Sequence, residues 1–300
     1  MKSFILTLSM ILVFGLLTAE IHQSAGRYGY KFLNVPTSPI SLALAGRGAH
    51  SSANPAAFIL QPAASCETDQ RILGLSHSPW LEDTQANTLA YSYGKRVSHF
   101  GIALRNLDYG ELENRDDFGN LIGSYNPLDL DLMANYAHRF SPNLYFGLNF
   151  GVLYQKLDTA TSLGLHSDFG FSYIPPIADS KLSAAIRNIG NATKTNDVAT
   201  RFPTTIEADF TKVFQFNVAE VMLGVSGTKV VDEGFKESIY SEVSLFKVLK
   251  LRGGYKFHYA AENFSVGFGL AVRRISVDYG FGAFGEGLND VHSVGLAYQF

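Results

Sequence analysis

From residue 71 onward, hydrophobic and polar residues alternate with a period of two, which is the period of a β-strand. In the clearest stretch, the even positions from 128 to 136 read Leu-Leu-Leu-Ala-Tyr, and the odd positions from 129 to 137 read Asp-Asp-Met-Asn-Ala. No amphipathic helical pattern interrupts this series. The pattern therefore predicts an all-β chain of about fourteen strands. They are expected near residues 71–77, 86–93, 98–106, 128–139, 144–155, 163–173, 181–188, 204–212, 219–228, 237–246, 249–258, 263–272, 275–284 and 291–300.

The lengths of the strands and of their connections are typical of a membrane barrel. A tilted strand needs about nine to eleven residues to cross a bilayer, and several of the predicted strands are that long. Outer-membrane barrels alternate short periplasmic turns with longer outer loops. At Arg273 and Arg274 the apolar series moves from even to odd positions, which predicts a two-residue hairpin turn. Long connections at 107–127, 189–203, 229–236, 258–262 and 285–290 alternate with short ones at 141–143, 174–179, 247–248 and 273–274.

The alternation leaves two architectures open, because it does not say which face is inside. In a transmembrane antiparallel β-barrel the bulky apolar series faces lipid and the small or polar series faces the lumen, whereas a soluble β-sandwich reverses this. Two features favour the barrel. Tyrosines lie toward strand ends, where aromatic girdles form, and the last strand carries Tyr298 and Phe300 on its apolar face. We interpret this pair as the signal that barrel assembly machinery reads. The tyrosines are Tyr91, Tyr93, Tyr136, Tyr154, Tyr173, Tyr255 and Tyr298.

The N-terminal region divides into two segments before the barrel. Lys2 precedes an apolar run from Phe4 to Leu17 that is too short to span a bilayer, so residues 1–19 are expected to be a signal peptide; a second candidate cleavage site follows Ala25. Residues 20–70 have weak periodicity, and the stretch 26–66 is rich in Ala, Ser and Pro, which favours a plug inside the lumen. The barrel is expected over residues 71–300. After export, the protein is expected in the outer membrane of a Gram-negative bacterium.

Charge, cysteine content and motif spacing exclude several classes of function. The net charge of −3 gives no basic excess for a phosphate backbone, so nucleic-acid binding is not expected. The single cysteine, Cys66, excludes a disulfide framework and a cysteine-based zinc site. The segment Asn114–Asn120 has clustered acids but Phe118 at the fifth position, so it fails the calcium-loop spacing. The glycine-rich stretch 280–285 lacks the helix of a phosphate loop and is expected to be closely packed strand. No metal or cofactor is predicted.

Two sets of residues are candidates for the lumen. Phe58, Ile59 and Leu60 are expected to line a ligand pocket in the plug. A second, polar set belongs to the lumen-facing series, and its mixed charges can neutralise one another. The alternative for this set is a selectivity lining or a hydrolytic constellation, although His166 and Asp168 lack a serine at a recognisable spacing. The polar set comprises His166, Asp168, Arg187, Glu207, Asp209, Arg252, Lys256, His258, Arg273 and Asp278.

Several motifs in the mature chain resemble the PorV/PorQ family of outer-membrane barrels, which are related to FadL-type fatty-acid transporters. In the plug they are Gly29–Pro36 (GYKFLNVP), Ser41–His50 (SLALAGRGAH), Asn54–Ala57 (NPAA) and Gln61–Ala63 (QPA). In the barrel they are Ser76–Leu81 (SHSPWL), Leu107–Gly110 (LDYG) and Gly119–Asn120. The chain departs from the family at residues 61–64, where Gln-Pro-Ala-Ala replaces Asn-Pro-Ala-Gly and removes an amide-capped turn start and a permissive glycine.

The resemblance implies a barrel of about fourteen strands and a part in type IX protein secretion. We therefore expect a monomeric, non-enzymatic barrel that contacts outer-membrane lipids and the barrel assembly machinery. The secretion translocon or exported proteins would be its further partners, with the loop from Leu107 to Pro127 as the candidate contact. The alternative is a FadL-like transporter of hydrophobic small molecules across the outer membrane. An apolar pocket in the plug would favour transport, whereas a plug packed solid would weaken it.

Overall fold

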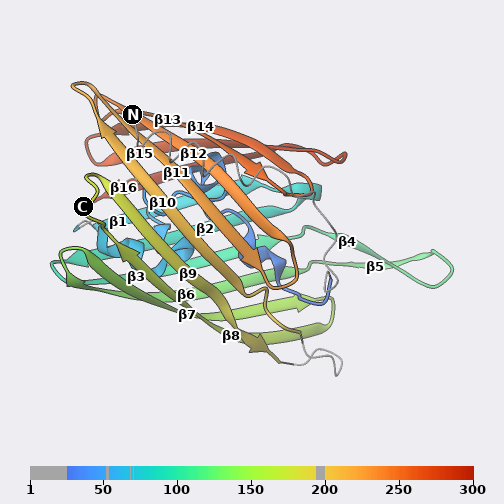
Figure 1. Cartoon of the computed structure of the whole chain (residues 1–300). Coiled ribbons are helices and arrows are strands. Elements are labelled where there is room, and N and C mark those ends of the chain that lie inside the picture. The colour runs from blue at the N-terminus through green and yellow to red at the C-terminus, as the bar shows by residue number, and fades with distance from the viewer. Residues whose placement is uncertain (1–25, 52–53, 68, 70, 194–199) are drawn as a thin grey trace.

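The computed structural model describes residues 26–51, 54–67, 69, 71–193 and 200–300. Sixteen strands and five short helical segments make up this part of the chain (Figure 1). The helical segments are η1 (Lys31–Asn34), α2 (Pro39–Ala43), α3 (Ala57–Leu60), η2 (Pro62–Glu67) and η3 (Leu81–Asp83). The strands are β1 (Arg71–Pro79), β2 (Gln85–Lys95), β3 (Ser98–Asp108), β4 (Leu112–Arg115), β5 (Leu121–Tyr125), β6 (Leu128–Ser141), β7 (Leu144–Leu157), β8 (Ala160–Tyr173), β9 (Ser180–Ala192), β10 (Thr205–Gln215), β11 (Ala219–Val230), β12 (Phe235–Leu245), β13 (Leu249–Phe257), β14 (Glu262–Val272), β15 (Ile275–Phe284) and β16 (Val291–Gln299).

Fourteen of the strands form one closed antiparallel barrel. Each pairs with its neighbours in chain order, with β3 next to β6, and β1 pairs with β16 to close the sheet. Closure leaves no unpaired sheet edge. The predicted fold class and strand count are confirmed, and a soluble sandwich of two sheets is excluded. The hairpin between β14 and β15 turns at Arg273 and Arg274, where the apolar series changes parity.

The barrel has two different ends. The end that carries Arg71, Phe300 and the connection at 273–274 is called the turn end, and its connections are short. The opposite end, called the loop end, carries the connection between β3 and β6 and the one between β9 and β10. The predicted alternation has two exceptions. At the loop end only Asp158 and Thr159 separate β7 from β8, and at the turn end the connection 174–179 between β8 and β9 is longer than the loop-end connections 231–234 and 258–261.

The two faces of the wall have opposite chemistry. On β6, β7 and β8 the bulky residues Leu132, Phe150 and Leu165 point outward and remain about half exposed, at 47%, 53% and 50%. The inward residues of the same strands, such as Asp131 and Asn149, are buried. This is the arrangement of a barrel whose outer surface faces a hydrocarbon phase.

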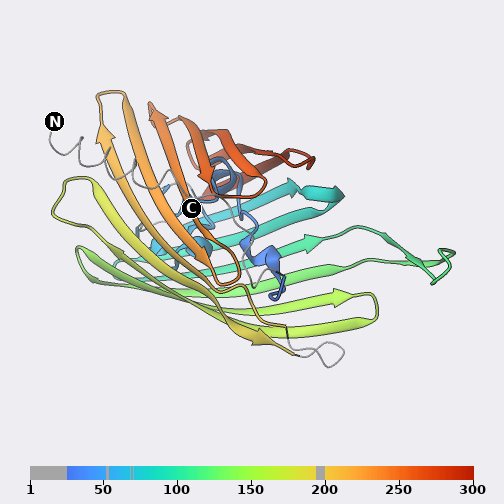
Figure 2. The same ribbon diagram turned by 45° about the vertical axis from the view of Figure 1, so that its right-hand side comes forward.

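The sequence pattern missed one element, the hairpin of β4 and β5 within the predicted loop 107–127. It extends past the loop end of the barrel (Figures 1 and 2). Leu112, Phe118, Leu121 and Ile122 are exposed on it, and Phe118 reaches 92%. Residues 112–125 lack a strict alternation because the hairpin has no buried face to select one.

Most of the described N-terminal segment, from Tyr30 to Cys66, lies inside the barrel (Figure 2). The segment from Pro39 to Cys66 is called the plug here, and it packs on inward positions of the wall that are glycine. A Cβ at Gly295 would lie 2.8 Å from Pro39, and one at Gly101 would lie 2.8 Å from Phe58. Gly280 likewise faces the backbone of Pro39. The glycine-rich β15 is therefore closely packed strand, as its sequence predicts, because a side chain there would collide with the plug.

Two predictions for the N-terminal region concern the signal peptide and the turn at Gln61. The predicted signal peptide, residues 1–19, lies outside the described residues. At Gln61, where the chain departs from the resembled family, the turn keeps an amide cap, because the side-chain oxygen of Gln61 accepts from the backbone N–H of Ala63 at 3.3 Å. The expected loss of a capped turn start is therefore wrong for this residue: glutamine supplies the amide that asparagine would.

Candidate functional site

A cavity of about 520 Å³ lies at the loop end of the barrel, above the plug. Its walls come from the chain just before the plug, from the plug itself, and from the loop ends of strands on both sides of the barrel. Two further pockets in the described part of the chain, one beside Pro39 and one beside Phe58, have volumes of only about 20 Å³, roughly the space of one water. The large cavity is therefore the candidate site for a small molecule.

The segment Gly29–Pro36, here called the cap, lies across this cavity at the loop end. Arg105, a buried residue of β3, donates to the backbone carbonyls of Phe32, Leu33 and Val35 at 3.2, 3.4 and 3.4 Å. The carbonyl of Phe32 also accepts from the backbone N–H of Val35 at 3.0 Å, whereas the C-terminal end of a 3-10 turn such as η1 leaves carbonyls that need another donor, which the guanidinium supplies. Arg105 thus ties the cap to the wall.

A second tie joins the cap to the connection between β11 and β12. The ammonium of Lys31 lies 2.8 Å from Asp232 and 2.9 Å from Glu233. Burial lowers the pKa of Lys31, but the hydrogen bonds and charges of these two carboxylates outweigh it, and the net pKa shift is upward. Burial raises the pKa of Glu233, but Lys236 and Lys31 outweigh it and leave the pKa below its usual value. Both partners are thus held in their charged forms.

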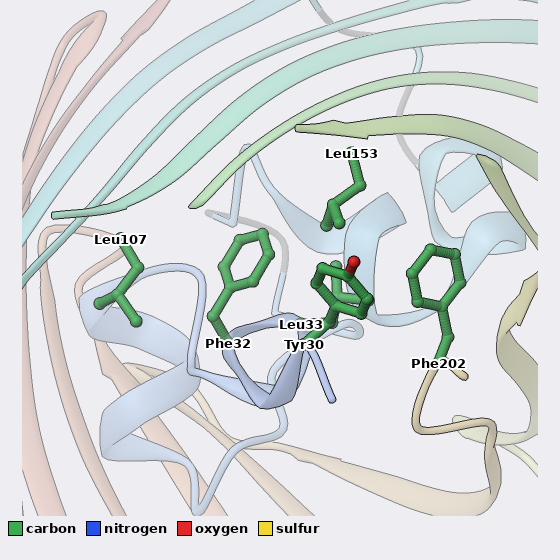
Figure 3. Close-up of a cluster of buried hydrophobic side chains, with 6 residues drawn as sticks. All are labelled: Tyr30, Phe32, Leu33, Leu107, Leu153 and Phe202. Atoms are coloured by element: carbon green, nitrogen blue, oxygen red, sulfur yellow. The ribbon is translucent and has the colours of Figure 1, made fainter. Parts of the chain in front are cut away.

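The apolar side of the site centres on the cap. Tyr30, Phe32 and Leu33 of the cap pack with Leu107 and Leu153 of the wall and with Phe202 of the connection between β9 and β10 (Figure 3). The ring of Tyr30 meets that of Phe202 edge-on, with centroids 5.0 Å apart, and its hydroxyl shares a hydrogen bond of 2.5 Å with Ser162. Phe32, Val35, Leu60, Trp80 and Leu107 line the cavity itself.

The charged side of the site gathers around Tyr259. Lys236 and Lys256 lie 4.5 and 5.1 Å from the centre of its ring, and Arg47 donates to its hydroxyl at 3.4 Å. Carboxylates accompany these cations: Glu262 pairs with Lys256, and Glu207 pairs with Arg47. The cavity therefore offers an apolar wall opposite a cluster of cations and carboxylates, which suits a molecule with an apolar body and a polar end.

The three predicted plug residues occupy one short helix, α3, and all are buried. Leu60 lines the large cavity. Phe58 and Ile59 lie deeper, in an apolar cluster with Ala103 and Met133 of the wall. Of the three, the structure brings only Leu60 to the large cavity, and contact between this helix and a ligand stays a prediction.

The predicted polar set divides into interior pairs and one exposed residue. His166 lies 2.9 Å from Asp131 and 3.7 Å from Asp168, and Arg252 lies 2.7 Å from Asp278. Arg187 and Glu207 are 3.0 Å apart. The opposite charges are thus paired with one another inside the barrel. The further pairs of the set are Lys256 with Glu262, His258 with Glu237, and Asp209 with Tyr240.

Arg273 is not a lumen residue. It lies in the turn between β14 and β15 with a positive φ of 57° and is exposed at the turn end. Its assignment to the lumen was wrong because the parity slip places it between the strands rather than on either of them.

One histidine, serine and aspartate do meet in the interior, but not in a catalytic arrangement. The Nε2 atom of His50 lies 2.9 Å from the hydroxyl of Ser183 and 3.6 Å from Asp209. A nucleophile relay needs the serine and the carboxylate on different ring nitrogens. Ser183 also does not line the cavity. The described residues contain no cluster of three His, Cys, Asp or Glu side chains placed to hold a metal ion.

Tyr298 and Phe300 stand together on the outer face, with ring centroids 4.9 Å apart. The backbone N–H of Phe300 donates to Arg71 at 2.9 Å, so the terminal residue lies beside the start of β1 at the closing seam. Recognition of this pair by assembly machinery stays a prediction.

Sequence reasoning missed four residues that shape the site: Lys31, Arg105, Trp80 and Tyr259. Arg105 had a usable signal, because it lies on the inward series of its strand with Gly101 and Ala103. Lys31, Trp80 and Tyr259 lie in connections or in the cap, where no periodicity indicates direction. No helix in the described part of the chain is long and apolar enough to cross a membrane.

Comparison with known proteins supports the fold. No family model and no curated protein matches the sequence. The toluene transporter TodX of Pseudomonas putida is 14% identical and superposes with a TM-score of 0.64, over 91% of this chain and 98% of its own. The CymD monoaromatic hydrocarbon channel is 13% identical, with a TM-score of 0.63 over 89% and 98%. A FadL homologue of Pseudomonas aeruginosa is 10% identical, with a TM-score of 0.59 over 87% and 98%.

Proposed function

We propose that this protein is a non-enzymatic outer-membrane channel that binds small, mainly apolar molecules in the loop-end cavity and passes them inward. The observation that carries the proposal is the 520 Å³ cavity between cap and plug, inside a barrel whose outer face is apolar. Ligand sites in proteins have volumes of about 300–1,000 Å³, so the cavity suits a drug-sized or smaller molecule.

Membrane insertion follows from the chemistry of the wall. The outward residues form a continuous apolar belt, and the closed sheet satisfies its backbone hydrogen bonds internally. Short turns at one end and longer loops at the other suit a barrel with its turn end in the periplasm. The loop end, and with it the cavity, would then face the outside. The similarity to outer-membrane channels of hydrophobic compounds supports the same placement.

The lining of the cavity indicates the class of ligand. Phe32, Leu60 and Leu107 would contact an apolar body, while Lys236 and Lys256 would lie near a polar or acidic end. The similar proteins are described as channels for toluene and for monoaromatic hydrocarbons. A small aromatic compound, with or without a carboxylate, is therefore the proposed ligand.

Passage requires a local rearrangement. Leu60, Ala45 and Gly46 of the plug line the cavity, and below them the plug residues Phe58, Ile59 and Ala63 are buried against the barrel wall. The cavity is thus a binding site on the route rather than an open pore. Movement of the cap or of the upper plug would connect it to an exit.

The single tryptophan of the chain, Trp80, lines the cavity and gives a direct assay. Brominated compounds quench indole fluorescence on contact, so 4-bromotoluene should quench Trp80 saturably. Val230 also lines the cavity, and Val230→Phe should weaken this quenching about tenfold by filling the space. The matched control is Val266→Phe, a valine that points outward and is 45% exposed. Quenching that does not saturate, or that both variants weaken equally, would refute a binding site in the cavity.

A part in secretion is a second candidate, and the hairpin of β4 and β5 is the feature that favours it. Its exposed Phe118, Leu121 and Ile122 offer an apolar contact beyond the loop end. If exported proteins bind there, deleting residues 112–125 should retain secreted proteins in the periplasm while quenching of Trp80 is unchanged. A normal surface proteome in that deletion would reject this role and leave transport intact.

A further inference from the structure

Five exposed basic residues lie side by side at the turn end. We call Arg71, Arg96, Lys247, Arg273 and Arg274 the basic arc. They occupy three hairpin turns and the start of β1, which follow one another around the barrel from β12 to β3. Backbone hydrogen bonds place the end of β16 between Arg274 and Arg71: Gln299 donates to Arg274 at 2.8 Å, and across the closing seam Phe300 donates to Arg71 at 2.9 Å. The arc therefore spans the seam as one continuous surface.

Bulky apolar residues stand directly beside these cations. Phe246 precedes Lys247 and is 71% exposed, Val97 follows Arg96, and Val272 precedes Arg273. Such exposure is unfavourable in water. It is favourable where an acyl chain covers the apolar residue and a headgroup meets the cation, as at a membrane surface.

The backbone conformation of the turns indicates that the basic and apolar side chains of the arc are required at these positions. Arg96, Phe246, Lys247 and Arg273 all have positive φ, between 52° and 58°. A positive φ favours Asn, Asp and Gly, and other residues in this conformation cost about 1 kcal/mol each. The chain places arginine, lysine and phenylalanine at these positions against the local preference.

Few acidic groups oppose the arc. Among the described side chains of this sector, Asp69 is the exposed carboxylate, and it lies 3.6 Å from a ring nitrogen of the buried His99. Arg71 stacks on the ring of Tyr93 at 4.7 Å, which holds its guanidinium at the outer surface of the barrel. The cations of the arc are thus directed at the medium around the turn end of the barrel.

We propose that the basic arc binds the anionic headgroups of phospholipids in the leaflet at the turn end. Guanidinium groups pair with phosphate oxygens through two parallel hydrogen bonds, and basic residues near a membrane surface attract anionic lipid. The proposal rests on the membrane-spanning part of the proposed function, and it is independent of ligand passage. The bound lipid would extend the outer apolar belt across the seam between β1 and β16.

The test compares lipids that remain bound to the full-length barrel. The protein is released from nanodiscs of phosphatidylcholine containing either phosphatidylglycerol or cardiolipin, and bound lipids are counted by native mass spectrometry. In the test variant Arg96, Lys247, Arg273 and Arg274 are each changed to Gln. In the control, four exposed loop-end cations are changed to Gln, so that the net charge is the same: Arg27, Arg115, Lys156 and Arg201.

Wild type and control should retain the anionic lipids in preference to phosphatidylcholine, and the test variant should lose that preference by about tenfold. The difference in lipid preference between wild type and the test variant should be smaller at high salt, because salt screens the attraction between the basic arc and the headgroups. Equal preference in the two variants would overturn the proposal. Quenching of Trp80 by 4-bromotoluene should be the same in all three proteins. A barrel that enters no bilayer would instead contradict the proposed membrane location, and the two failures are therefore distinguishable.

Discussion

The hydrogen bonds from Arg105 to the cap lead to a quantitative prediction. Arg105→Met keeps most of the apolar stem but removes the donors to the carbonyls of Phe32, Leu33 and Val35. All three contacts come from one nitrogen, Nη2, which carries two hydrogens and shares them among the three carbonyls. Two hydrogen bonds of about 1 kcal/mol each are therefore lost, so closure of the cap becomes less favourable by about 2 kcal/mol. Asp131 is not left alone, because it keeps His166 at 2.9 Å.

A loss of about 2 kcal/mol corresponds to an opening of the cap that is about 30-fold more frequent. The N–H groups of Leu33 and Val35 report it directly, since each donates to a carbonyl inside the cap at 3.0 Å. Hydrogen exchange of these two amides should therefore be about 30-fold faster in the variant. The wall strands around Leu153 should exchange at the wild-type rate.

The matched control is Arg139→Met. Arg139 also points inward and donates to a carbonyl of the N-terminal segment, that of Cys66 at 2.8 Å, but near the turn end. Its loss should loosen η2 and leave the cap closed. If Leu33 and Val35 exchange equally fast in both variants, the effect is general loosening and the role assigned to Arg105 is refuted.

Three further predictions test the packing, the charge and the pH range of the site. Gly280→Ala should destabilise the folded protein by about 1–3 kcal/mol through collision with the plug. At Gly253 a Cβ would meet the carbonyl oxygen of Ser265 at 3.8 Å, an ordinary contact, so Gly253→Ala should not change the melting temperature. Lys236→Gln should lower the affinity for 4-bromobenzoate about fivefold relative to that for 4-bromotoluene, because only the benzoate has a carboxylate for the cation to attract. An unchanged ratio of the two affinities would exclude contact between Lys236 and the carboxylate. The pKa of Glu233 is lowered from its ordinary value of 4.5 and that of Lys31 is raised from its ordinary value of 10.5, so the ion pair between them is lost only at a pH below or above that range. Trp80 emission, which senses the cap, should therefore be constant between about pH 4.5 and 10.5 and shift outside that range; a shift near pH 7 would contradict this role.

The barrel could be predicted from sequence because a strand has two faces and a lipid-facing wall makes them chemically distinct. The pattern at 128–137 located a strand and separated its two faces, and the slip at Arg273 located a turn that contains no glycine or proline. The hairpin of β4 and β5 could not be predicted in this way, because neither of its faces is buried.

The site was harder to predict, since its contacts join segments that are far apart in the chain. Lys31 and Glu233 are 202 residues apart, and nothing in the local pattern relates them. Leu60 belonged to an apolar run that indicated burial but not which member of the run meets a cavity. Trp80 and Tyr259 lie in connections, where backbone direction is set by the tertiary structure rather than by periodicity.

The contact between plug and wall also bears on the order in which the chain assembles. The seam is formed by six residue pairs, Ile72–His77 with Val294–Gln299, whereas β7 and β8 share fourteen. Pro55 meets Gly74 on one side of the seam, and Pro39 meets Gly295 on the other. A segment synthesised before every strand thus touches both the first strand and the last. It can serve as the template on which the two ends of the sheet find each other, so that the barrel closes around its contents rather than being filled afterwards.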